Sequence, residues 1–150
     1  MKKHETTWIV IADGGQARIL ISDSKAHKLQ QLPNGSFSDP QLPTHELVTD
    51  RQPRVRESKS NTSHAIEPKM DAHKKRKIDF IQNLLRYIER SAEGNSFDRL
   101  VIVAPPFILG EIRKYLSPRL QQLVRAEISH DYTHQTSDYI YEQLKDALTQ

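Results

Sequence analysis

The chain of 150 residues and 17.3 kDa has the length of one ordinary domain, which excludes two full-sized domains. It has no cysteine, so a disulfide scaffold, a thiolate metal site and a cysteine nucleophile are excluded, and we expect a cytoplasmic location. The longest apolar stretch, residues 100–110, is far shorter than the roughly 20 residues that a bilayer span requires. We therefore expect no membrane insertion.

Two runs of β-branched residues, Thr7–Ala12 and residues 17–21, predict a β-hairpin at the start of the domain. The turn between them contains Gly14 and Gly15, which can supply the positive φ angles that a tight hairpin requires. Residues 28–32 predict a third strand at the edge of the sheet.

Several prolines and serines in residues 33–48 indicate irregular structure, with a short strand near residues 46–48. The positive charge is concentrated further on, since residues 51–77 carry nine cations and three anions, a local net charge of +6. This segment has almost no apolar residue before Ile78, so we predict a long, basic, mobile loop at about 49–70. Such a charge run either keeps the protein soluble or contacts a polyanion.

From Asp71 the pattern is helical, and we predict one amphipathic helix to about Glu93, ended by Gly94 and Asn95. Its apolar stripe consists of Ile78, Ile81, Leu84, Leu85 and Ile88. The continuous apolar run at residues 100–104 predicts a central strand that is buried on both faces.

After Pro105 and Pro106, apolar residues recur every four positions, with an interruption at Ser117 and Pro118 that predicts two consecutive helices. Residues 126–129 predict a short strand, and Thr136 or Ser137 can cap a final helix. This order of elements predicts a single α/β domain over residues 1–150, with a mixed sheet, an N-terminal β-hairpin and helices on both faces.

The motifs of the chain give weak support to catalysis. The tripeptide Gly14-Gly15-Gln16 matches the signature with which class I release factors hydrolyse peptidyl-tRNA, but its place between two strands favours a simple hairpin turn. No His-Glu-x-x-His or Gly-x-Ser-x-Gly motif occurs, so we predict neither a metal site nor a cofactor. The alternative is a hydrolase whose acid, base or metal-binding groups are Asp13, Asp131, His64 and His134.

The basic segment favours RNA, because cations there can neutralise phosphates and release counterions. No aromatic residue lies between Arg51 and Ile78, so backbone contact with structured RNA is expected rather than base stacking. The predicted RNA-binding residues are Arg51, Arg54, Arg56, Lys59, Lys69, Lys74, Lys75 and Arg76.

Four segments, in this order, resemble the bacterial family described as "protein required for attachment to host cells". They are WIVIADGGQAR at residues 8–18, HAIEP at 64–68, FDRLVIVAPP at 97–106 followed by Leu109 and Gly110, and DYTH at 131–134. That family is similar to the middle domain of archaeal and eukaryotic release factors and of the rescue protein Pelota, an α/β fold of the ribonuclease-H-like kind.

The resemblance implies that the ribosome or tRNA is the partner, and that the loop before the long helix is the one that carries Gly-Gly-Gln in true release factors. Here that loop holds His64, Glu67 and Pro68 instead, which would shape it, and peptidyl-tRNA hydrolysis is not expected. The leading hypothesis is a non-enzymatic, cytoplasmic domain that contacts RNA or the ribosome. A third alternative is a protein interaction module with an indirect role in attachment.

Overall fold

The computed structural model describes residues 5–23, 28–39 and 59–148, with side chains from Ala72 onward in the first helix. Five strands form one mixed sheet in the order β3-β2-β1-β4-β5. They are β1 (Thr7–Ala12), β2 (Gln16–Asp23), β3 (Lys28–Ser38), β4 (Arg99–Ala104) and β5 (Val124–Ser129). The first three are antiparallel neighbours, whereas β1, β4 and β5 run parallel.

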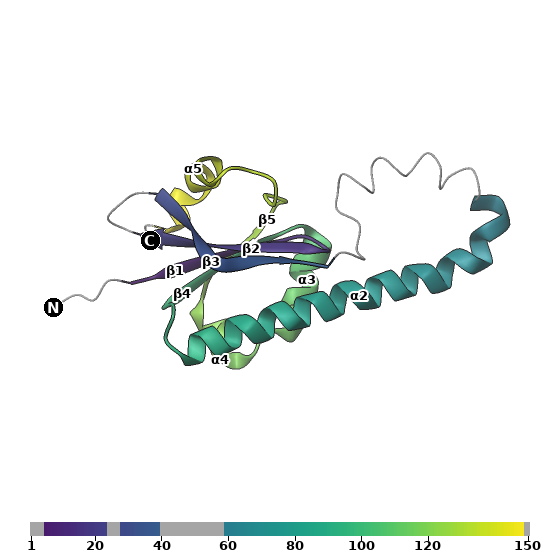
Figure 1. Cartoon of the computed structure of the whole chain (residues 1–150), viewed down its shortest axis with the longest axis horizontal. Coiled ribbons are helices and arrows are strands. Elements are labelled where there is room, and N and C mark those ends of the chain that lie inside the picture. The colour runs from purple at the N-terminus through teal and green to yellow at the C-terminus, as the bar shows by residue number, and fades with distance from the viewer. Residues whose placement is uncertain (1–4, 24–27, 40–58, 149–150) are drawn as a thin grey trace.

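Helices cover both faces of the sheet, as predicted (Figure 1). They are α2 (Lys59–Glu93), α3 (Pro106–Tyr115), α4 (Pro118–Leu123) and α5 (Ser137–Leu148). The first three pack on one face, and α5 packs alone on the other. No helix in the described part of the chain is both long and apolar enough to cross a membrane.

The sequence explains the interior strands directly. All side chains of β1 and nearly all of β4 are buried, because each strand lies between a helical layer on either side. After β2 and β3, helix α2 leads the chain back to the middle of the sheet. There β4 pairs in parallel with the central strand β1. The predicted α/β fold, the hairpin and the two helices after Pro105 are confirmed.

The two caps also match expectation. Ser117 accepts a hydrogen bond from the Leu120 N–H and caps α4, with Pro118 in the first turn. Thr136 accepts one from the Tyr139 N–H at the start of α5 (3.0 Å).

The third strand differs from the prediction, because it continues through the proline at residue 33 to Ser38. Arg18 pairs with Ser36 and Leu20 with Gln31, so the intervening part of β3 bulges. The bulge contains Asn34 with a φ of 59° and accommodates the proline at the edge of the sheet. The predicted strand at 46–48 lies outside the described residues.

The prediction of a loop at 49–70 was wrong for residues 59–70. Residues 49–58 lie outside the described residues, but α2 begins at Lys59 and includes His64, Glu67 and Pro68, which were expected to shape a loop. The apolar stripe from Ile78 onward packs the helix against the sheet, and extending a formed helix is much easier than starting one. An interior proline removes one backbone hydrogen bond and clashes with the preceding turn, yet α2 continues through Pro68.

Candidate functional site

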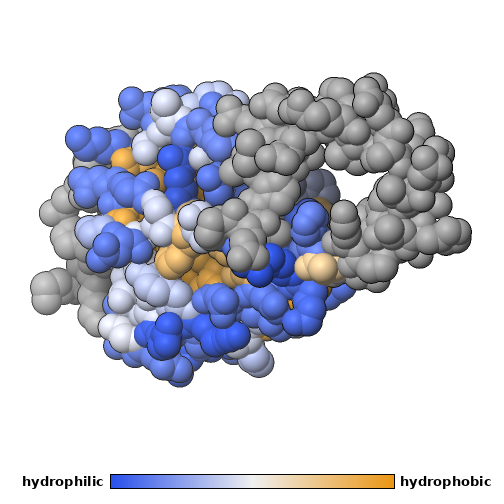
Figure 2. All heavy atoms as spheres, turned by 45° about the vertical axis from the view of Figure 1, so that its right-hand side comes forward, coloured by the Kyte–Doolittle hydropathy of each residue, from blue (hydrophilic) through white to orange (hydrophobic). Residues whose placement is uncertain are grey.

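The candidate site lies where the parallel strands end. Because β1, β4 and β5 run in the same direction, their carboxyl ends meet at one edge of the sheet, where α/β domains commonly bind ligands. In Figure 1, α2 extends beyond the body of the molecule at this edge. In Figure 2 this side is turned toward the viewer, and hydrophilic side chains surround a smaller group of apolar ones.

The hairpin turn at this edge is organised by the buried carboxylate of Asp13. Its Oδ1 accepts hydrogen bonds from the N–H groups of Gly15 (2.9 Å) and Gln16 (2.8 Å), and the Asp13 N–H donates to the Gln16 carbonyl (2.8 Å). No described glycine has a positive φ, so the expected reason for Gly14 and Gly15 was wrong. The side-chain turn at Asp13 makes the reversal instead.

Thr133 joins the two carboxylates that the hydrolase alternative named. Its N–H donates to Asp131 Oδ1 (3.2 Å), and its hydroxyl lies within hydrogen-bonding reach of both Asp131 Oδ1 and Asp13 Oδ2. His134 is exposed, and His64 precedes the first described side chain of α2. Among the described residues, no group of three or more metal-binding side chains gathers.

The predicted RNA-binding residues fall into three groups. Arg51, Arg54 and Arg56 lie outside the described residues, and Lys59 and Lys69 stand on α2 before its first described side chain. The remaining three stand on consecutive positions of α2. They are Lys74, Lys75 and Arg76.

Two of these three cations are open to solvent. The Nζ of Lys74 lies 6.0 Å from the ring centroid of Phe107, an aromatic side chain at the start of α3 that is 45% exposed. The Nζ of Lys75 lies 3.5 Å from Asp79 Oδ2, and both of those side chains are highly exposed. Exposed ion pairs of this kind contribute little to stability, so Lys75 is not held by Asp79. Both lysines can therefore contact another molecule.

Arg76 is instead engaged within the protein. Its Nε and Nη2 lie 2.9 Å and 3.0 Å from the two carboxylate oxygens of Asp39, just after β3. The Asp39 N–H in turn donates to the Gly15 carbonyl (2.9 Å). This two-point contact fastens α2 to the hairpin edge. Sequence reasoning missed it because the partners are 37 residues apart and lie in different elements.

Lys77 lies against the same hairpin turn. A Cβ atom at Gly14 would come within 3.1 Å of the Lys77 Cε and 3.3 Å of its Cδ. The absence of a side chain at Gly14 therefore lets the lysine stem cross the turn closely. The tripeptide at residues 14–16 thus has a structural role in this turn, as the sequence suggested.

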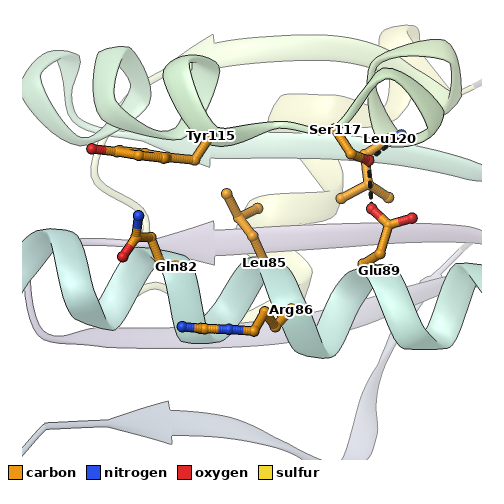
Figure 3. A pocket seen from close by; sticks show the side chains of 7 residues that line it. All are labelled: Gln82, Leu85, Arg86, Glu89, Tyr115, Ser117 and Leu120. Carbon is orange, nitrogen blue, oxygen red and sulfur yellow. Dashed lines mark hydrogen bonds between the residues drawn. The ribbon is translucent and has the colours of Figure 1, made fainter.

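A separate groove of about 300 Å³ lies between α2 and the corner of α3 and α4 (Figure 3). Leu85 and Leu120 form its apolar part. Glu89 points across it from α2, accepts a hydrogen bond from the Ser117 hydroxyl and lies 3.4 Å from the Arg119 Nε. Glu89 and Arg86 give this groove one negative and one positive side chain, so it offers no concentrated positive charge for a polyanion.

Comparison with known proteins supports the fold. An archaeal translation termination factor, aRF1, has a TM-score of 0.51 and 12% identity, over 96% of this chain and 39% of that one. A second structure, described as an archaeal protein, has a TM-score of 0.40 and 14% identity, over 96% and 38%. This chain thus spans about two fifths of each, and the first likeness confirms the predicted release-factor-like fold.

No curated protein is similar enough in sequence to be matched. A family model described as "Protein required for attachment to host cells" matches residues 8–144. That match covers nearly all of the chain, including the hairpin, the buried strand β4 and the loop that leads into α5. The chain therefore belongs to the family of proteins required for attachment to host cells.

Proposed function

We propose that this protein is a non-enzymatic, cytoplasmic domain that binds structured RNA, including RNA of the ribosome, through the basic N-terminal half of α2. The observation that carries the proposal is the pair Lys74 and Lys75, two exposed cations on α2, of which Lys74 lies beside Phe107 at the start of α3. Neither is held in a two-point ion pair like that of Arg76, whose partner Asp39 is mostly buried.

The charge distribution supports the same conclusion. Residues 51–77 have a net charge of +6, whereas the rest of the chain has a net charge of −3. A polyanion would therefore approach this segment first, and each phosphate contact would release condensed counterions. Contact with the sugar-phosphate backbone requires no aromatic platform, in agreement with the lack of aromatic residues between Arg51 and Ile78.

The family description names attachment to host cells. In our proposal that role is indirect, because binding to RNA would act on the synthesis of other proteins. The Asp13–Thr133–Asp131 contacts do not require catalysis to explain them, since both carboxylates accept hydrogen bonds from their own loops.

The test is RNA binding measured by fluorescence anisotropy over a range of salt concentrations, together with co-sedimentation with ribosomes. The double variant Lys74→Ala/Lys75→Ala should bind more weakly at low salt, and its slope of log affinity against log salt should fall by about 1 for each phosphate that the variant no longer neutralises. Arg76 stays unchanged because its ion pair with Asp39 fastens the helix.

The matched control is Arg86→Ala/Arg90→Ala, which removes two exposed cations from the other end of the same helix. This control should keep the wild-type salt dependence. Equal slopes for the wild type and both double variants would contradict the proposal, as would a complete lack of RNA binding at low salt.

A further inference from the structure

A second hollow lies on the α5 face of the sheet, bordered by β2, β3 and the loop that leads into α5. Its volume is about 300 Å³. Arg18 pairs with Ser36, and Gln16 pairs with Ser38, so these four side chains project from the same face of adjacent strands. Thr133 adds a hydroxyl from the loop. We call this hollow the Arg18 pocket.

The charge of Arg18 is not balanced within the described protein. Its guanidinium is half-buried, and Nη2 donates to the neutral carbonyl oxygen of Gln135. Its Nε is shielded from solvent and has no hydrogen-bond partner there. No carboxylate in residues 5–23, 28–39 or 59–148 forms an ion pair with it. Burial lowers the pKa of Arg18, yet an arginine stays charged at physiological pH.

The ion pair of Arg76 shows which kind of partner Arg18 lacks. That guanidinium is also partly buried, and it has a carboxylate, Asp39, at two-point distance. Partial burial takes hydration away from the Arg18 charge, and no carboxylate replaces it, so Arg18 favours a negative group that enters its pocket from outside.

We propose that the Arg18 pocket binds a phosphate group. A guanidinium matches the oxygens of a phosphate in a two-point contact. The hydroxyls of Ser36 and Ser38 and the amide of Gln16 add donors around it. The volume is at the lower end of the range for ligand pockets and suits a small group. This inference does not depend on α2, because none of the residues that line the pocket belongs to that helix.

The experiment is a ¹H–¹⁵N NMR titration of the full chain with inorganic phosphate. Saturable shifts should centre on the backbone amides of Gln16, Arg18, Ser36 and Ser38. In Arg18→Gln, which removes the charge and keeps a donor for the Gln135 carbonyl, the dissociation constant should rise at least about tenfold. An unchanged constant would overturn the proposal.

Two further variants keep the test valid if Arg18→Gln folds poorly. Ser38→Ala changes an exposed side chain and should weaken phosphate binding about threefold by loss of one donor. Asp131→Asn should strengthen it, because this carboxylate contacts the Thr133 hydroxyl beside the pocket and repels an anion. Phosphate binding that is the same in both variants and in the wild type would contradict the pocket assignment.

The source of the phosphate is distinguished by parallel titrations with a nucleoside monophosphate and with one RNA oligonucleotide, with and without a 5′-phosphate. Tighter binding of the phosphorylated oligonucleotide would assign the pocket to an RNA end, whereas equal binding of inorganic phosphate and the mononucleotide would assign it to small phosphates. Both results support the proposal, and a lack of saturable shifts with every probe overturns it. Lys74→Ala/Lys75→Ala should leave the phosphate titration unchanged, so failure of the RNA proposal is recognisable separately.

Discussion

The two faces of the sheet differ in how completely helices cover them. On one face α2, α3 and α4 enclose a large apolar cluster that includes Trp8, Phe80 and Phe97. On the other face α5 packs alone over a smaller cluster around Ile140 and Leu144. Helix α5 has 12 residues and packs mainly against β3, so it leaves open the ends of β2 and β3 at Gln16–Arg18 and Ser36–Ser38, which carry polar side chains and the Arg18 pocket. The fully covered face therefore contributes more to stability, and the partly covered face has space for a ligand.

The largest effect is expected from Ile81→Ala on the α2 face. Ile81 is fully buried between α2 and the sheet, where three helices hold the walls in place and a cavity cannot close. The free energy of unfolding should fall by about 4 kcal/mol. Urea unfolding followed by the fluorescence of Trp8, the one tryptophan, measures it. Ile78→Ala, at a partly buried position of the same helix, should cost less than half as much.

The equivalent change on the other face, Ile140→Ala, should cost about 2–3 kcal/mol. Ile140 is as fully buried as Ile81, but α5 is a single outer helix that can move toward the sheet and partly fill the cavity. The same urea titration gives the comparison. A loss equal to that of Ile81→Ala would show that α5 is held as rigidly as α2, and the contrast between the faces would fail.

The covered face was also the one that the sequence predicted best. The spacing of Ile81, Leu84 and Ile88 on α2 and the unbroken apolar run in β4 are local patterns, and local patterns determine which side of an element is buried. The start of α2 was missed because residues 59–70 have no apolar stripe and contain Pro68, so nothing nearby marks a helix.

The Arg18 pocket was not predictable in the same way. Arg18, Ser36 and Thr133 are far apart in the chain and belong to no motif, and only the sheet register and the loop into α5 bring them together. The bulge in β3 hid the register as well, because Pro33 and Gly35 normally indicate the end of a strand. Sites assembled from distant residues with ordinary side chains leave no local signal.

A smaller effect should separate the two kinds of cation on α2. The Arg76–Asp39 pair has two-point geometry and a mostly buried carboxylate, so a double-mutant cycle with Arg76→Gln and Asp39→Asn should give a coupling energy of about 1 kcal/mol. The pair Lys75–Asp79 is exposed, and its cycle should give about 0.3 kcal/mol. Added salt should reduce the second value more than the first. Equal coupling energies in the two cycles would show that Arg76 is held no more firmly than Lys75.

The smallest effect is expected at Gly14, where the hairpin meets α2. Its φ is not positive, so alanine fits the backbone, and the three atoms nearest to a new Cβ all belong to the flexible Lys77 side chain. Gly14→Ala should therefore stabilise the protein by about 0.4 kcal/mol through the lower entropy of the unfolded chain, less the cost of moving the lysine. Thermal unfolding would detect this as a small rise in Tm. With Lys77→Ala in the background the gain should grow, because the lysine stem 3.1 Å away is then absent. A destabilisation above about 1 kcal/mol in both backgrounds would mean that the turn needs the conformational freedom of glycine after all, and that Asp13 alone does not hold it.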